Sequence, residues 1–289
     1  MPHAVAAYLM WGLLPLYMVF LPHVPPFEFV GWRAVCTLPV CLMAMVIYRQ
    51  GAEVLAAMRN FRVMAILCAT AMFIACNWVV YVVAIQEGHV LAASLGYYIN
   101  PLVNVLAGTL FLGEKLTSRQ WAAVALAAAG VSLLAWDARD MLGISLTLAI
   151  SFSSYGLLRK LVPVNSLPGL TIEALVLLPA AIGVLLWQSS TNGALSIGSD
   201  LTTDALLAGS GLITAIPLLL FAVAARRMDY STLGFIQYLA PTLVLLQGLF
   251  LYHEPLRPVQ LACFVAIWAA IGIFSWDLLA RRRTATLQR

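Results

Sequence analysis

Residues 94–116 read S-L-G-Y-Y-I-N-P-L-V-N-V-L-A-G-T-L-F-L-G-E-K-L, and this stretch decides the fold. It is apolar and long enough to cross a membrane as one helix, which needs about 20 residues. It nevertheless carries Tyr97, Asn100 and Asn104 at the i, i+3, i+7 spacing of one helix face, with Pro101 beside them. It stops at a charged Gly-Glu-Lys corner, residues 113–115. The stretch therefore predicts a membrane-spanning helix with a polar face.

The composition requires lipid as the solvent for much of the chain. Hydrophobic residues make up 63% of the sequence and charged residues 10%, with a mean hydropathy of +0.94. A soluble domain carries about 25% charged residues. The net charge of +4 is modest and is not the pattern of a nucleic-acid-binding protein.

The cysteines and histidines do not form the pattern of a metal or redox site. The five cysteines all lie in apolar stretches without Cys-x-x-Cys spacing, and the four histidines do not cluster with carboxylates. We therefore expect buried free thiols, no metal and no cofactor.

Ten apolar runs are long enough to span the hydrocarbon layer, and runs of this length exclude barrel strands. We expect ten transmembrane helices at 4–21, 28–48, 63–85, 90–112, 119–136, 142–160, 168–188, 205–225, 230–252 and 259–280. The first run lacks a basic flank and a small-residue cleavage site, so it is expected to be a retained helix and not a signal peptide. Its abrupt start suggests that a short basic segment is missing before it.

The basic residues orient these ten helices. With the N-terminus inside, thirteen of the sixteen fall in inside loops, namely Arg49, Arg59, Arg62, Lys115, Arg119, Arg159, Lys160, Arg226, Arg227, Arg281, Arg282, Arg283 and Arg289. Outside loops hold Arg139 and Arg257, and Arg33 lies within a span. Cytoplasmic loops are enriched in Lys and Arg, so both termini are expected in the cytoplasm. The chain is expected to be a multi-pass protein of the cell inner membrane.

The opening stretch returns near the C-terminus. Pro101 and Glu114 are thirteen residues apart, and so are Pro241 and Glu254. Other matches recur at offsets of 140 to 145 residues. We therefore expect two repeats of five helices, over 4–136 and 142–280. Because five is odd, the second repeat must cross the membrane in the opposite direction, an arrangement typical of secondary transporters with a site between the two halves.

Several of these stretches resemble the EamA-type permeases of the drug/metabolite transporter superfamily. They are Glu28 with 31–33, Cys76-Asn77-Trp78, residues 92–104, Leu112-Gly113-Glu114 and residues 231–235. The resemblance extends over essentially the whole chain. It implies a ten-helix fold of two EamA repeats, with a central cavity lined mainly by helices 1, 3, 4, 6, 8 and 9. It also implies transport of small metabolites or drugs across the bacterial inner membrane.

The polar face of the fourth helix is the first candidate site. Asn100 is ten residues from the start of this helix, which places it about 15 Å deep, near the midplane. Pro101 cannot donate a backbone hydrogen bond, so it should free the carbonyl of Tyr97. We expect Tyr97, Asn100 and Asn104 to bind substrate. The alternative is that the asparagines tie helices together through hydrogen bonds worth about 1 kcal/mol.

The second repeat keeps the proline but loses the asparagines. Asn100 corresponds to Ala240 and Asn104 to Val244, while Gln237 stands opposite Tyr97. Pro241 should free the carbonyl of Gln237 in the same way. We therefore expect the prolines to serve the transport motion and the polar side chains, Gln237 included, to set the substrate.

Three other helices offer polar or aromatic residues at helical spacing. These are Asn77, Trp78 and Tyr81 on helix 3, Tyr8, Trp11 and Pro15 on helix 1, and Thr147, Ser151, Ser154 and Tyr155 on helix 6. Together they predict a cavity lining without a fixed charge, suited to a neutral, zwitterionic or amphipathic substrate. The alternative for each aromatic residue is packing against lipid or a place in the interfacial belt.

Charged residues within or beside the spans are further candidates, because they are expensive in lipid and usually functional. Glu28 and Arg33 lie on the second helix, and Glu173 is the counterpart of Glu28 on the seventh. They would either brace a gate on each side or fix helix depth at the interface. Proton coupling through Glu28 or Glu173 is a third interpretation. Glu114 and Glu254 would cap helix N-termini or pair with neighbouring cations.

The sequence predicts a transporter and not an enzyme. It holds no nucleotide-binding loop, Rossmann glycine pattern, catalytic triad or metal cluster. Its expected partners are a small-molecule substrate and the lipid bilayer, with no nucleic acid, in a monomer or homodimer. Export by alternating access is the expected activity, and a membrane-embedded sensor or scaffold is the alternative.

Overall fold

The computed structural model describes the chain except for residues 88, 138, 252, 254–256 and 288–289. The described residues form α-helices and one short 3-10 helix, without strands. The α-helices are α1 (Pro2–Met18), α2 (Pro26–Ile47), α3 (Gly51–Arg59), α4 (Phe61–Gln86), α5 (Val90–Phe111), α6 (Ser118–Asp137), α7 (Leu142–Leu161), α8 (Ser166–Asn192), α9 (Leu201–Arg227), α10 (Tyr230–Gln237), α11 (Leu239–Phe250) and α12 (Pro258–Leu287), with η1 (Arg139–Met141) before α7. Each expected apolar run coincides with a helix, except that the ninth forms α10 and α11.

The prediction of an all-helical membrane protein is confirmed. By length and composition, seven segments of the described chain can cross a membrane, where ten were expected. They are Pro26–Ile47, Phe61–Ile85, Arg139–Leu161, Ser166–Thr191, Leu201–Arg227, Tyr230–Phe250 and Pro258–Ala280.

The helix ends follow from local sequence. Three helices begin at a proline, Pro2, Pro26 and Pro258, whose missing N–H would have no partner in the first turn. The Asn60 side chain accepts hydrogen bonds from the backbone N–H groups of Arg62 and Val63 at the start of α4. Asp200 caps α9 in the same way, by accepting from the N–H of Thr203 at 2.9 Å.

Helix α3 was not expected from the hydrophobic runs. It is nine residues long and amphipathic, too short to span a bilayer. Val54 and Ala57 are buried in a cluster with residues of α4 and α8. Glu53, on the same helix, accepts hydrogen bonds from the backbone N and the Nδ2 of Asn165, at 2.7 and 2.8 Å. Helix α3 therefore braces the connection between α7 and α8.

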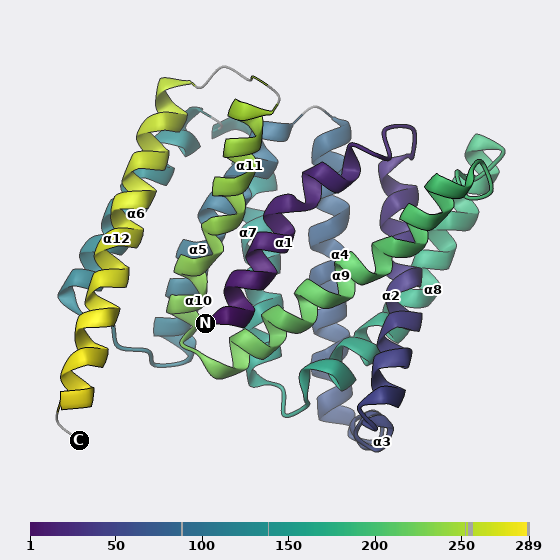
Figure 1. Ribbon diagram of the computed structural model, residues 1–289, viewed down its shortest axis with the longest axis horizontal. Helices are drawn as coiled ribbons and strands as arrows, with labels where there is room; N and C mark the ends of the chain where they lie inside the picture. Colours follow the sequence, from purple (N-terminus) through teal and green to yellow (C-terminus); the bar gives the residue numbers. More distant parts are fainter. Residues whose placement is uncertain (88, 138, 252, 254–256, 288–289) are drawn as a thin grey trace.

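Figure 1 shows the helices in two layers, with α12, α11, α1 and α9 nearer to the viewer and α6, α5, α7, α4 and α8 behind them. The pair α6 and α12 closes one edge of the molecule. Helix α2 closes the other edge, packed against both α8 and α9. Between the layers, α5 crosses α10 and α7 crosses α9. Side chains from both layers therefore meet in the centre of the bundle.

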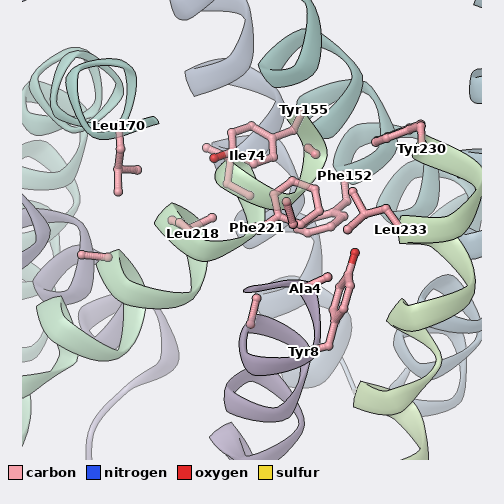
Figure 2. Packing of buried hydrophobic residues seen from close by; sticks show 14 of the residues in the cluster. Ala4, Tyr8, Ile74, Phe152, Tyr155, Leu170, Leu218, Phe221, Tyr230 and Leu233 are labelled. Atoms are coloured by element: carbon pink, nitrogen blue, oxygen red, sulfur yellow. The ribbon is translucent and has the colours of Figure 1, made fainter. Parts of the chain in front are cut away.

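The largest buried cluster lies between these layers, in the middle of the bundle. Figure 2 shows Phe152, Tyr155 and Phe221 packed ring against ring, with Tyr8 below them and Tyr230 and Leu233 to one side. These residues come from α1, α7, α9 and α10. Burying such large aromatic surfaces is among the strongest sources of packing energy, so this cluster joins the two layers firmly.

The two prolines at matching positions of the expected repeats have different surroundings. Helix α5 continues through Pro101. The helical run that contains Pro241 is interrupted at Tyr238, so it forms α10 and α11. Pro241 has no N–H to donate to the carbonyl of Gln237, which is the residue where α10 ends. The backbone is therefore disrupted more near Pro241, at the junction of α10 and α11, than near Pro101 in α5.

Candidate functional site

The main cavity of the described structure has a volume of about 520 Å³. It extends from Tyr8 and Gln237, in the middle of the bundle, to the end where α1 finishes at Met18 and α5 begins at Val90. Its wall comes mainly from α1, α2, α4, α5, α11 and α12. This end of the bundle, which we call the open end, also holds the last turns of α4 and α11. A cavity of this size accommodates a small organic molecule.

Aromatic side chains close the inner end of this cavity. Trp11 lies 5.5 Å from Phe152 and 5.7 Å from Phe221, measured between ring centroids. Tyr155 stacks on Phe221 at 6.0 Å, one layer further from the cavity. We call these four residues together with Tyr8 the aromatic floor, and the opposite end of the bundle the closed end. Figure 2 shows Tyr8, Phe152, Phe221 and Tyr155 in this arrangement.

Eight of the residues expected to bind or gate substrate line the cavity wall. They are Trp11, Arg33, Asn77, Trp78, Tyr81, Tyr97, Gln237 and Pro241. Tyr81 and Tyr97 meet edge to face at 5.9 Å, so α4 and α5 present one aromatic surface to the cavity. The Asn77 amide is oriented away from solvent, since its Nδ2 donates to the carbonyl of Leu148 at 2.9 Å and to Ser151 Oγ at 3.1 Å.

Asn100 and Asn104 do not line the cavity, although both were expected to bind substrate. Asn100 Nδ2 donates to the carbonyl of Ala149 at 2.8 Å. Asn104 Nδ2 donates to Gln237 Oε1 at 2.8 Å, and Ser153 Oγ donates to Asn104 Oδ1. Both side chains are 1% exposed or less. The alternative interpretation, that they tie helices together, therefore describes this conformation.

Depth along α5 explains the difference between Tyr97 and the asparagines. Asn104 follows Tyr97 by seven residues, which places it about 10 Å further toward the closed end on nearly the same face. The cavity has ended at that level, where Gln237 and Tyr8 meet through a 3.3 Å hydrogen bond from the Tyr8 hydroxyl. Gln237 therefore connects the buried asparagine network to the cavity wall.

The remaining expected residues lie elsewhere. Pro101 is in the crossing of α5 and α10, where its carbonyl oxygen approaches Gly234 so closely that a Cβ there would lie 2.8 Å away. Ser154 is half-buried and lines neither this cavity nor the smaller one described below. Tyr155 lies in the aromatic floor. Position 254, expected to cap a helix, is outside the described residues.

Arg33 has a different place from the one expected. We expected a lining without fixed charge, but Arg33 and Arg257 both line the cavity, and the described lining includes no Asp or Glu. Arg33 Nε donates to Thr214 Oγ1 at 3.1 Å, and its guanidinium carbon lies 4.6 Å from the centroid of the Trp78 ring. Guanidinium stacking on tryptophan is a favourable cation–π contact. In the sequence, only the presence of an arginine inside an apolar run pointed to this role. Its depth in the helix does not tell whether the side chain faces lipid or a cavity.

Glu28 and Glu173 make separate contacts at opposite ends of the bundle. Glu28, 1% exposed, accepts from the backbone N of Ser196 at 2.7 Å and from Ser196 Oγ at 2.9 Å, so it fixes the loop between α8 and α9. Glu173 pairs with Arg159 at 3.6 Å and accepts from Thr70 Oγ1 at 2.6 Å. Arg159 is fully buried, although its charge was assigned to an inside loop.

A second, very small cavity of about 20 Å³ lies between the main cavity and Glu173. Ile74, Trp78 and Leu218 line both cavities, and Glu173 and Tyr155 line only the small one. The carboxylate of Glu173 is therefore separated from the main cavity by a thin wall of side chains.

Glu114 caps the N-terminus of α10. Its carboxylate accepts from the backbone N of Tyr230 at 2.5 Å, the backbone N of Ser231 at 2.9 Å and Ser231 Oγ at 2.7 Å. A carboxylate at a helix N-terminus is stabilised by the exposed N–H groups and by the helix dipole. Gly108 makes the contact possible, since a Cβ there would lie 2.5 Å from Glu114 Oε2. Glu114 was expected to cap a helix, and it caps α10. Helix α10 belongs to the second expected repeat, whereas Glu114 lies in the first.

Comparison with known proteins gives consistent results. The pattern of the EamA-like transporter family matches residues 2–136. An uncharacterized transporter of Pseudomonas aeruginosa is 42% identical over 275 residues, covering 94% of this chain and 92% of that protein. Protein RarD of Escherichia coli is 37% identical over 284 residues, covering 98% and 96%.

A solved structure described as "Crystal structure of protein" has the same fold. It aligns with a TM-score of 0.73 and 22% identity, covering 97% of both chains. The similarity at this level of identity concerns the fold alone.

Proposed function

Because this chain belongs to the EamA-like transporter family, whose members are multi-pass membrane transporters, we propose that it is a secondary transporter of the inner membrane. It moves a small metabolite or drug-like amphipathic compound by alternating access, in the export direction. The observation that carries this proposal is the cavity between the helix layers, open toward one end and closed toward the other by the aromatic floor. The substrate would contact Trp11, Trp78, Tyr81, Tyr97 and Gln237.

The helix contacts support two inverted five-helix repeats. Under the proposed correspondence, the contact of α5 with α7 matches the contact of α11 with α1, and both contacts between the halves are present. Likewise, α4 packed on α7 matches α9 packed on α1. The contacts α6–α12, α5–α10 and α2–α8 each join a helix to its own counterpart. Such symmetry is expected when alternating access exchanges the roles of the two halves.

One departure from this symmetry coincides with the cavity. Helix α7 packs against α9. The corresponding helices of the other repeat, α1 and α4, make no comparable contact among the described residues and instead face the cavity. If the two ends exchange roles, closing α1 onto α4 would seal the open end. Separating α7 from α9 would open the closed end.

The basic residues support an outward-facing assignment for this conformation. The closed end carries Arg49, Arg59, Arg62 and Arg119, while Arg139 and Arg257 lie at the open end. Cytoplasmic loops are enriched in basic residues, so the proposed topology has ten spans with both termini inside and the cavity open to the outside. In an exporter this state releases substrate.

Transport into and out of proteoliposomes tests the proposal. The purified chain would be assayed with labelled amphipathic metabolites and drug-like compounds, beside two variants of α11. Val244 lines the cavity, so Val244→Trp should abolish flux, whereas Leu246 does not line it and Leu246→Trp should retain flux. Flux by neither the wild type nor Leu246→Trp, above that of empty vesicles, would contradict transport and favour a membrane-embedded sensor.

A further inference from the structure

Arg33 is a cation on the wall of the main cavity. It lies on α2, seven residues after Pro26, and is half-buried. Its Nε donates to Thr214 Oγ1, whose own hydroxyl donates to the carbonyl of Ser210 at 2.8 Å. The face of the guanidinium lies over Trp78. The side chain is therefore held in one orientation by α9 on one side and α4 on the other.

Within the described part of the chain, no carboxylate pairs with Arg33. The nearest acid in sequence, Glu28, accepts from Ser196 and from Trp32 Nε1 at 3.2 Å. Glu173, another deeply buried acid, pairs with Arg159. Among the described residues, nothing accepts a hydrogen bond from the two terminal nitrogens of Arg33. The terminal nitrogens of this half-buried arginine are therefore available to an anion that enters the cavity.

We propose that the substrate supplies it: the transported molecule is an amphipathic organic anion whose carboxylate binds the terminal nitrogens of Arg33. This inference rests on the proposed transport function and names the substrate class of the same cavity. A guanidinium offers parallel N–H groups that match the two oxygens of a carboxylate. With Nε occupied by Thr214, the outer edge of the group is the part left for such a partner.

The rest of the wall suits the body of such a molecule. The Trp78 ring lies against Arg33, and Tyr81 and Tyr97, which lie edge to face, line the same cavity. The described lining contains Arg33 and no carboxylate, which disfavours an ammonium group and hence a zwitterion or a cationic drug. The substrate class is therefore a monocarboxylate with an apolar or aromatic body.

A net negative charge also gives the export direction a driving force. With the cytoplasm negative, a potential of about 100 mV holds a monovalent anion at roughly a fifty-fold concentration excess outside at equilibrium. Movement of the anion alone would then be electrogenic and would need no coupling ion.

Binding of matched acids and amides tests the charge requirement. The full chain in detergent would be titrated with phenylacetate, 3-phenylpropionate and hexanoate, and with the amide of each, while thermal unfolding is followed. The acids should stabilise the protein with apparent affinities about tenfold or more above those of their amides. Equal affinity of acid and amide, or no stabilisation by any of the three acids, would overturn the proposal.

Variants test whether Arg33 is the residue that recognises the carboxylate of the ligand. Arg33→Gln should bring acid and amide affinities to within about twofold of each other, and Arg33→Lys should retain part of the preference. Arg139→Gln, at an exposed position outside the cavity, removes the same charge and should leave the preference unchanged. A preference that survives in Arg33→Gln would overturn the proposal. The comparison of acid and amide on the wild type remains decisive if a variant does not fold.

Flux measurements separate this inference from the proposed function. In proteoliposomes with the interior negative, right-side-out transporter should lose preloaded phenylacetate faster than phenylacetamide, and collapsing the potential should slow the loss. Flux of neutral compounds without flux of carboxylates would overturn the anion proposal and keep the transporter. Acid binding that depends on Arg33, without flux of any compound, would keep the anion site and overturn transport.

Discussion

The two ends of the helix bundle use charged side chains in opposite ways. At the closed end, Arg159 is paired with Glu173, and Glu114 accepts three hydrogen bonds at the start of α10. At the open end, Arg33 faces the cavity with no carboxylate partner among the described residues. The same residue type therefore stabilises the fold at one end and is available to a ligand at the other. A buried arginine in a membrane helix has to be classified by its partner, not by its depth.

The largest effect is expected from breaking the ion pair at the closed end. Arg159→Met leaves Glu173 buried without a counter-charge and should lower the free energy of unfolding by roughly 3–5 kcal/mol. Replacing both residues, as Arg159→Met with Glu173→Leu, should recover most of that loss. Denaturant unfolding of the purified protein in detergent measures both.

The matched variant at the open end sharpens this contrast. Arg33→Met removes a cation without a carboxylate partner, so we expect a change in unfolding free energy of less than about 1 kcal/mol in the absence of ligand. A loss as large as that of Arg159→Met would show that Arg33 has a structural role, and the two ends would no longer differ.

The next largest effect is expected at the Glu114 cap. Hydrogen bonds to a charged group contribute about 1.5–3 kcal/mol, so Glu114→Ala should destabilise the protein by about that amount. The loss arises at the closed end, where the carboxylate joins α5 to α10. Glu87→Ala, an exposed acid at the open end, is the control and should be neutral. Similar unfolding midpoints for the two variants would contradict a structural role for the cap.

The sequence predicted the long membrane helices better than the short helix and the helix interruption. Apolar runs of about 20 residues identify spans because lipid leaves the backbone few alternatives to a helix. Helix α3 was missed because its nine residues form a surface helix that no long apolar run announces. In the sequence, only Pro241 indicated the interruption at Tyr238. A proline alone was not a sufficient signal, because α5 is continuous through Pro101.

The candidate site was predicted in part for a related reason. Helical spacing showed that Tyr97 and Asn104 share a face, but it could not show that the cavity ends between them. The depth at which α10 meets α5 is set by Gly234 on Pro101, a contact between residues more than one hundred positions apart. Arg33 was expected to brace a gate or to fix helix depth, and not to line the cavity, because its neighbours across the bundle, Thr214 and Trp78, lie on other helices.

A smaller effect is expected from the buried asparagine network between the two ends. Asn104→Leu removes the contacts with Ser153 and Gln237 and should lower stability by about 1–2 kcal/mol. It should also weaken substrate binding indirectly, because Gln237 would lose the partner that orients it at the cavity. Thr109→Val is the control on α5, since the Thr109 hydroxyl bonds only to carbonyls of its own helix. Unchanged stability and binding in Asn104→Leu would show that Gln237 is held by other contacts.

The smallest effect on stability is expected at the prolines. Pro241→Ala restores an N–H that can bond to the carbonyl of Gln237, so α10 and α11 should join, with a change in unfolding free energy of within about 1 kcal/mol. Pro101→Ala lies in a helix that is already continuous, so its conformation should change less. If the interruption at Tyr238 lets the half-helix at the closed end move separately from the half-helix at the open end, Pro241→Ala should slow transport more than Pro101→Ala while both retain substrate affinity. Equal slowing by the two substitutions would show that the prolines act alike, and the asymmetry between α5 and the α10–α11 pair would then be a feature of this conformation alone.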